Sequence, residues 1–137
     1  MATKSIQKKR LDAPDEVRTF DKGMVELATV GTVTFGRARF EPGWKWSESV
    51  KPIVKTEYCQ AAHVQYQVSG HLRVKMADGS EQGFGPGDVG VIPPGHDAWV
   101  IGDEPVVAID ISGMVRYAKP LARRVVKKSA KAKKRKR

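Results

Sequence analysis

Cysteine is almost absent from this 137-residue sequence, in which Cys59 is the only one. A single cysteine excludes a disulfide within the chain and is typical of proteins from a reducing compartment. No apolar run approaches the length of a transmembrane helix, and the polar residues 1–10 do not resemble a secretory signal. We therefore expect a cytoplasmic protein with no membrane span.

Common nucleotide-binding and nucleophile motifs are missing as well. The sequence contains no P-loop, no dinucleotide-binding glycine motif and no Ser/His/Asp nucleophile signature. It has instead about nine or ten short apolar runs, separated by turn signals such as Asp78-Gly79. This pattern predicts an all-β sandwich or closed barrel, and the length suits one domain with tails.

Acidic residues are absent from residues 116–137, although this segment holds twelve of the 25 Lys and Arg residues. Residues 1–115 carry a net charge of −2, with 13 Lys and Arg against 15 Asp and Glu. The sequence predicts a flexible N-terminal segment at 1–22, a β-barrel at 23–115 and a disordered Lys/Arg-rich tail at 116–137. Such a tail either holds nucleic acid without sequence specificity or acts only as a solubilising extension.

The strand pattern gives three more specific predictions. The run at 24–40 contains Gly36, where the alternation changes parity, and this favours a β-bulge. Trp44 and Trp46 fall on one face of a strand, and a loop at 47–57 is expected to cross the mouth of the barrel. One face of the last strand is expected to carry Val107, Ile109 and Ile111.

The stretch at residues 85–99 brings polar side chains to the end of a short strand. Gly87 closes a turn, an apolar β-branched run follows, and Pro93 and Gly95 end that run. His96 comes directly afterwards, where a rigid strand gives way to a loop. Sites of binding and catalysis often lie at such points, so His96 is a candidate site residue.

Gly87, Pro93 and Gly95 have the spacing of the second motif of the cupins, a family that the chain resembles over roughly residues 33–112. The resemblance implies a cupin-type double-stranded β-helix, or jelly-roll, barrel, and a homodimer, as is common for small cupins. The histidine of the family motif would fall on Ala98, two residues after His96.

A second group of polar residues shares one face of a strand. Cys59, His63, Gln65 and Gln67 have the same parity. If that face points into the barrel, its polar groups need hydrogen bonds or a bound ligand. Thiolate and neutral imidazole bind zinc, iron, nickel or copper well. The alternative is that Cys59 and His63 are ordinary core residues.

This stretch resembles the first cupin motif, with Gly70 at its glycine position. The resemblance places His63 at the motif's glutamate, and Glu57 and Cys59 at its two histidines. It implies a metal set of Cys59, His63, His96 and Glu57, and the softness of these ligands favours zinc. Two motifs, Cys-Gln-x-x-His and the later Pro-Pro-Gly-His-Asp-Ala-Trp, resemble those of a subgroup of small bacterial cupins without a settled activity.

The expected function is binding of a divalent metal, a small polar ligand or both at the mouth of the barrel. One alternative is a metal-dependent oxygenase or isomerase of cupin type. Another is a non-catalytic regulatory module that its basic tail holds on nucleic acid. Trp44, Trp46 and Trp99 either line a ligand pocket or only pack at the rim of the barrel. The expected ligand pocket comprises Gln65, Gln67, Trp44, Trp46, Trp99 and Tyr58.

Overall fold

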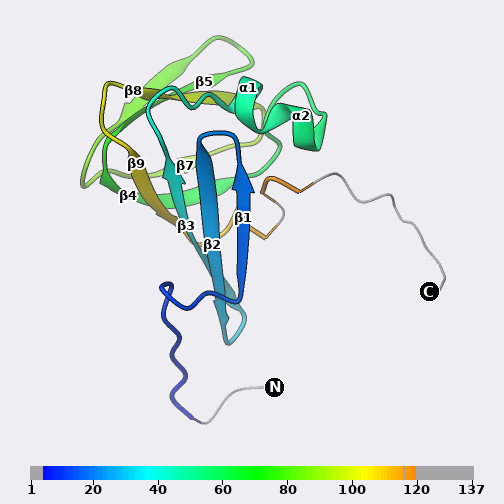
Figure 1. Ribbon diagram of the computed structural model, residues 1–137. Coiled ribbons are helices and arrows are strands. Elements are labelled where there is room, and N and C mark those ends of the chain that lie inside the picture. Colours follow the sequence, from blue (N-terminus) through cyan, green and yellow to red (C-terminus); the bar gives the residue numbers. More distant parts are fainter. Residues whose placement is uncertain (1–4, 116, 120–137) are drawn as a thin grey trace, which may run out of the picture.

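Two antiparallel sheets face each other in the computed structural model, which describes residues 5–115 and 117–119 (Figure 1). The larger sheet has the strand order β1-β2-β3-β9-β4-β7, and the smaller has the order β6-β5-β8. The described strands are β1 (Glu16–Phe20), β2 (Gly23–Val30), β3 (Val33–Phe40), β4 (His63–Ser69), β5 (His71–Met76), β6 (Glu81–Phe84), β7 (Val89–Ile92), β8 (His96–Ile101) and β9 (Val106–Asp110).

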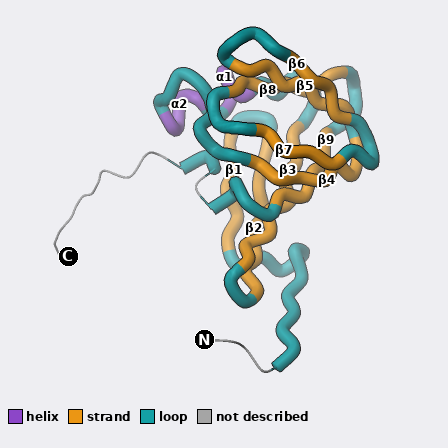
Figure 2. The backbone as a smooth tube through the Cα atoms, turned by 180° about the vertical axis from the view of Figure 1, so that it is seen from behind, coloured by secondary structure: helices purple, strands orange, loops and turns teal. Residues whose placement is uncertain are grey.

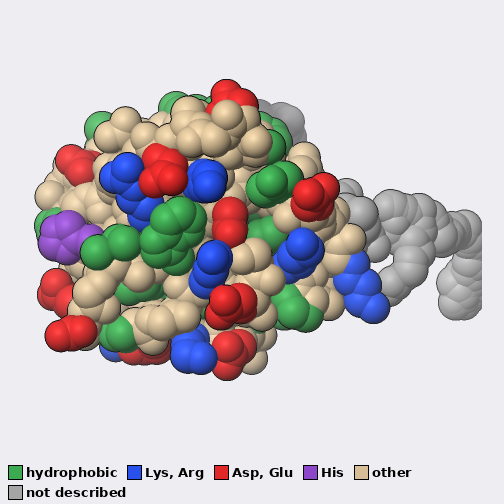
Figure 3. All heavy atoms as spheres, turned by 90° about the horizontal axis from the view of Figure 1, so that it is seen from above, with side chains coloured by type: hydrophobic (Ala, Val, Ile, Leu, Met, Phe, Trp, Pro, Cys, Tyr) green, Lys and Arg blue, Asp and Glu red, His purple; other side chains and the backbone are tan. Residues whose placement is uncertain are grey.

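The core lies between the sheets, because successive side chains of a strand point to opposite faces. In β5, Leu72 and Val74 are buried, whereas His71 and Lys75 are exposed, as the alternation predicts. On the outer face of the smaller sheet, viewed from above in Figure 3, acidic and basic side chains are interspersed with hydrophobic ones. Each fully buried aliphatic side chain contributes about 1.5–3 kcal/mol to stability, so this alternation defines the barrel.

The N-terminal part contains more regular structure than expected. Residues 16–20, within the segment predicted to be flexible, form β1 and pair with β2, from Glu16 opposite Leu27 to Phe20 opposite Gly23. The structure thus extends the larger sheet by one edge strand that the composition of residues 1–22 did not indicate.

The run at 24–40 is a hairpin and not a single bulged strand. It turns at Gly31, whose φ of 61° suits glycine, and β2 pairs with β3 in unbroken register. Gly36 lies opposite Leu27, and a side chain there would collide with Met114. The prediction of a bulge at Gly36 was therefore wrong, since the glycine makes room for a packed methionine. A register shift does occur in β4, between Gln67 and Ser69.

The segment after β3 is helical where a strand and a loop were expected. Lys45 makes one bridge to Trp99, and α1 (Trp46–Ser49) and α2 (Lys51–Val54) follow. Pro52 suits the first turn of α2 because the amide of that turn has no helical acceptor. In Figures 1 and 2 both helices lie at one end of the barrel, beside the last described residues.

The face of β9 on the parity of Val107, Ile109 and Ile111 is the outer one, a point that the sequence pattern left open. Val106, Ala108 and Asp110 are buried, and Ile111, just past the strand, is 46% exposed. The β-branched residues therefore lie on the outer face, and the inward parity carries a carboxylate that sequence alternation alone did not single out.

Residues 117–119, which the sequence assigned to the tail, are part of the described structure. Tyr117 is 5% exposed and contacts the rings of Phe20 and Phe40, so it belongs to the barrel. The rest of 116–137, apart from residues 118 and 119, lies outside the described residues. Neither described helix has the length and apolarity needed to cross a lipid bilayer.

Candidate metal centre

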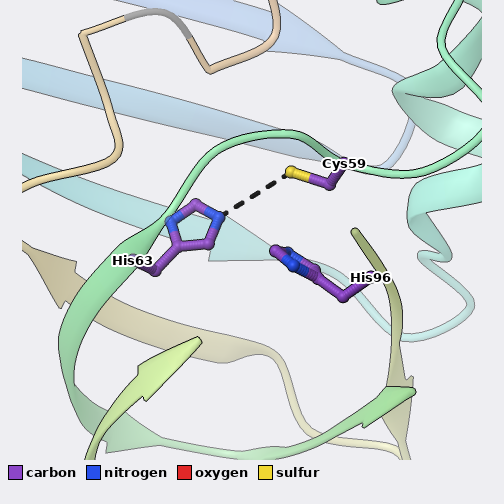
Figure 4. Close-up of side chains that lie close together, drawn as sticks. All are labelled: Cys59, His63 and His96. Carbon is purple, nitrogen blue, oxygen red and sulfur yellow. Dashed lines mark hydrogen bonds between the residues drawn. The ribbon is translucent and has the colours of Figure 1, made fainter. Parts of the chain in front are cut away.

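Three predicted ligands converge in the barrel, as Figure 4 shows. Cys59, His63 and His96 are each 3–4% exposed, and one potential ligand atom from each lies within 4.8 Å of the others. The rings of His63 and His96 meet edge to face, with centroids 5.3 Å apart. Residues from two separate parts of the chain, 59–63 and the start of β8, therefore form one buried cluster.

Backbone pairing sets the position of Cys59 beside His96. The amide of Cys59 donates to the carbonyl of His96 at 2.8 Å, and the amide of Gly95 donates to the carbonyl of Cys59 at 2.7 Å. His96 is the first residue of β8, and it alternates with the buried Ala98 and Val100. His96 and Ala98 therefore both face inward, two residues apart on β8. Ala98 is the position at which the cupin motif has its histidine.

Asp110 completes the site and was missed in the sequence. It is fully buried at the end of β9, and one of its carboxylate oxygens accepts a hydrogen bond from Nδ1 of His63. The other oxygen accepts the amides of Ser112 and Gly113 at 2.8 and 2.9 Å. The combination Asp-x-Ser-Gly at a strand end is the sequence signal that could have revealed this turn.

The hydrogen bonds orient both histidines as metal ligands. Because Nδ1 of His63 donates to Asp110, its Nε2 lies toward Cys59, 3.8 Å from Sγ. Nδ1 of His96 donates to the carbonyl of Pro93 at 2.7 Å, which leaves Nε2 as its ligand atom. A tetrahedral zinc ion with ordinary Zn–S and Zn–N bonds separates sulfur and nitrogen by roughly 3.6 Å. The Cys59–His63 separation of 3.8 Å is close to this value, so the cluster has the donor set and approximate spacing of a metal site.

The charges in the cluster are strongly coupled. Burial alone would raise the pKa of the Cys59 thiol, but hydrogen bonds from His63 and His96 lower it to about 6. Burial would lower the pKa of His63, yet Asp110 and Cys59 raise it to about 9. The pKa of Asp110 is lowered despite burial, chiefly by His63. Both shifts favour the charged forms, a thiolate on Cys59 and an imidazolium on His63.

Three predicted site residues lie elsewhere. Glu57 is exposed and is not part of the ligand cluster. Tyr58 is half-buried, and its carbonyl accepts hydrogen bonds from Thr56 and Gln60. Trp99 lies on the outer side of β8, where the ammonium of Lys45 is 5.5 Å from its ring centroid. Neither Tyr58 nor Trp99 lines any of the three described cavities.

The predicted glutamines and the other tryptophans are buried, in two different settings. Trp44, Trp46 and Gln65 line an interior cavity of about 30 Å³, together with His63 and His96. This volume holds about one water molecule and no larger ligand. Gln67 is fully buried and lies outside that cavity lining. Its amide donates to the carbonyls of Gly70 and Phe84 at 2.9 and 3.1 Å.

A larger cavity opens at the mouth, next to the cluster. It has a volume of about 500 Å³ and is lined by residues of α2, by Cys59 and the three residues after it, and by residues 112–113, 115 and 117–119. Trp46 and Tyr117 line both this cavity and the interior one, so they lie between the mouth and the histidines. The mouth cavity has the size of a small-molecule site, for which 300–1,000 Å³ is usual.

Arg18 holds the segment that carries Tyr117. Its guanidinium donates to the carbonyls of Met114 and Tyr117 at 2.7 Å and to that of Val115 at 2.8 Å. Burial first, and then the charges of Cys59 and Asp110, raise the pKa of Tyr117 well above its usual value. Tyr117 therefore stays neutral, and its ring lies 5.7 Å from that of His63.

Solved structures resemble this architecture. A sugar phosphate isomerase of the cupin superfamily from Silicibacter pomeroyi has a TM-score of 0.57, with 19% identity, and the match covers 80% of this chain and 76% of that one. The chain has a cupin-type fold. The sequence-based fold prediction is thereby confirmed, whereas at this identity the likeness of the cupin isomerase concerns the fold alone.

Two oxalate decarboxylases also resemble this fold. The Lactobacillus farciminis enzyme, solved as a formate complex, has a TM-score of 0.54 and 24% identity over 74% of this chain. The Bacillus subtilis enzyme, solved at pH 4.6, has a TM-score of 0.50 and 25% identity over 72%. The chain spans about a third of these cupin relatives, 32% and 27% of their lengths. No family model and no curated protein matches the sequence.

Proposed function

We propose that this protein is a metal-binding cupin whose barrel holds one zinc ion on Cys59, His63 and His96. The observation that carries the proposal is the convergence of three buried ligand atoms within 4.8 Å. A bound zinc ion would act as a Lewis acid toward a ligand at its open position. The protein's own contribution is orientation, because Asp110 fixes the ring of His63.

The reaction is left open in this proposal. A metal-dependent oxygenase or isomerase remains the first alternative, and a non-catalytic regulatory module the second. The residues that would hold nucleic acid, in the basic segment 116–137, lie almost wholly outside the described residues. Cytoplasmic location stays an expectation from the single cysteine, Cys59, which is free and buried.

Metal content tests the proposal directly. Protein purified without chelator is analysed by elemental mass spectrometry, and zinc is expected at about one ion per chain. Cys59→Ser and His96→Gln should each lose it, because each removes one of three ligands. His71→Gln is the matched control, since His71 is exposed and outside the cluster. Wild-type protein that neither contains metal nor takes it up on reconstitution would overturn the proposal.

His63→Ala is not suited to that test. Asp110 is fully buried, and His63 is its hydrogen-bonded partner. Removing one member of a buried charged pair costs about 3–5 kcal/mol, because the remaining charge is left uncompensated. Loss of metal in His63→Ala would therefore be confounded by loss of the fold.

We also propose that two copies pair through the outer face of β4 and β7. Val64 lies opposite Val91 and Tyr66 opposite Val89, and these four side chains are 40–74% exposed on the same side of the sheet. Contiguous exposed apolar surface of this kind is typical of protein interfaces. Light scattering should show a dimer that Tyr66→Lys dissociates, whereas Val17→Lys, on the far edge strand β1, should leave it intact. A wild-type monomer at high concentration would exclude the dimer.

A further inference from the structure

The mouth cavity differs from the interior of the barrel in both size and composition. Its volume of about 500 Å³ compares with about 30 Å³ beside the histidines. Val54 of α2, Ala61, Val115 and Ala118 supply aliphatic walls, and Trp46 and Tyr117 supply aromatic ones. Of these two cavities, the mouth cavity on the outer side of these two rings is the one with room for a ligand larger than a water molecule.

Most polar side chains in the cavity lining are already hydrogen-bonded within the protein. Thr56 donates to the carbonyl of Tyr58 at 2.8 Å, and Gln60 donates to the same carbonyl at 3.2 Å. Ser112 donates to the carbonyl of Ala62 at 3.1 Å. A ligand with many hydroxyl groups would bury them with few partners in this wall, which is costly.

Among the lining residues, Lys119 is the one Lys, Arg, Asp or Glu. The nearby acid Glu16 is held by Arg18, with hydrogen bonds of 2.8 and 3.2 Å. The cavity thus combines an apolar body with a single cation at the end of the described chain, while Cys59 of the metal cluster lies in its lining. This arrangement matches a ligand that has an apolar body and one negative charge.

We propose that the mouth cavity binds a small apolar monocarboxylate, with its body between Trp46, Val54 and Tyr117 and its carboxylate at Lys119. The inference deepens the proposed function, because it specifies the ligand class for the cavity that adjoins the cluster. It does not require metal, since none of the named contacts involves a metal ligand.

Octanoate is the probe, and an amide chemical-shift titration of ¹⁵N-labelled full-length protein is the measurement. We expect saturable shifts around residues 61, 113 and 118, with a dissociation constant on the order of 1 mM, given the affinity that small ligands gain per atom. Octanol should bind about threefold more weakly, since an exposed ion pair contributes little. Octylammonium should cause no shifts at these residues.

Paired variants locate the site. Ala61→Phe and Val54→Phe each fill the cavity and should weaken octanoate binding at least tenfold, while Ala77→Phe, at an exposed turn, should not change it. Two cavity variants are used so that one that fails to fold does not decide the result. Lys119→Gln should bring octanoate down to the affinity of octanol. Unchanged binding in a folded cavity variant, or equal affinity of wild type for octanol and octanoate, would overturn the inference.

The titration is run on both metal-free and zinc-loaded protein. If the protein retains no zinc on reconstitution but binds octanoate, the proposed metal function is refuted and the cavity site stands. If the protein retains zinc but does not bind octanoate, the cavity site is refuted and the metal function stands. The two proposals therefore fail separately.

Discussion

The two ends of the inward face of β4 bury polar side chains equally well and use them differently. At one end, His63 joins Cys59, His96 and Asp110 beside a cavity. At the other end, Gln67 is fully buried and donates its amide to two carbonyls, with no cavity beside it among those described. Burial of a polar group therefore identifies a site only when convergent groups or empty space accompany it.

The acidity of Cys59 is expected to show the largest effect at the His63 end. Its pKa of about 6, against an ordinary 9.0, is about a thousandfold change in acidity. Because Cys59 is the only cysteine, the ultraviolet absorbance of the thiolate in metal-free protein reports it alone. We expect a midpoint near pH 6 that moves toward 9 in His63→Gln. A wild-type midpoint near 9 would contradict the coupling.

The same coupling makes the stability of the metal-free protein depend on pH in two opposite ways. The pKa of Cys59 is lower in the folded chain, so its contribution is present above about pH 9 and is lost as the pH falls through 6. The pKa of His63 is raised from 6.5 to about 9, so its contribution is present below 6.5 and is lost as the pH rises through 9. Denaturant unfolding of wild type and Cys59→Ser across this range separates the two.

The Gln67 end should show a large loss of stability and no loss of metal. Gln67→Ala removes two buried hydrogen bonds and leaves two carbonyls without their partner, which costs about 2–4 kcal/mol in the free energy of unfolding. Zinc content is expected to stay at the wild-type value. Gln60→Ala, at an exposed residue, is the control for the loss of an amide. A reduced zinc content in folded Gln67→Ala would show that the Gln67 end of β4 also contributes to the metal site.

Asp110 should affect metal affinity without being a ligand. Asp110→Asn keeps the size of the side chain and removes the charge that orients His63, so zinc affinity should fall about tenfold to a hundredfold. Competition with a chromophoric chelator measures this change. Affinity equal to that of the wild type would show that Asp110 serves packing alone.

Arg18 should give the smallest effect. Arg18→Gln loses three hydrogen bonds to the carbonyls around Tyr117, which water partly replaces, so unfolding should become easier by about 1 kcal/mol. Thermal unfolding measures the loss, and zinc content should be unchanged. A loss of zinc would mean that the His63 end also depends on residues 114–117.

Alternation predicted the strands of the barrel, and it accounts for the shared burial of His63 and Gln67 on β4. Cys59 lies before β4 and is positioned by its bridge to His96, so its place beside His63 does not follow from strand parity. The motif around Gly87 and Pro93 placed His96 at the end of a strand, next to Cys59 in the fold.

The features that the sequence did not predict depend on contacts between residues far apart in the chain. Asp110 is a partner of His63 only because β9 pairs with β4, and its strand looked apolar on the opposite face. Tyr117 lies in a basic segment, and its burial follows from the carbonyl contacts of Arg18, 99 residues away. Gly36 leaves space for the side chain of Met114 and does not form a bulge. Local periodicity does not encode such pairings.

Gly113 has a consequence for recognising related chains. A β-carbon at this position would lie 2.6 Å from Nδ1 of His63 and would also collide with the carbonyl of Ala62. Any side chain there would displace the ring that Asp110 orients. Divergent relatives that keep the His63–Asp110 pair should therefore keep the combination Asp-x-Ser-Gly after their last strand, together with Cys-x-x-x-His. These two motifs could serve together as a search pattern for homologues whose overall sequence identity is too low to detect.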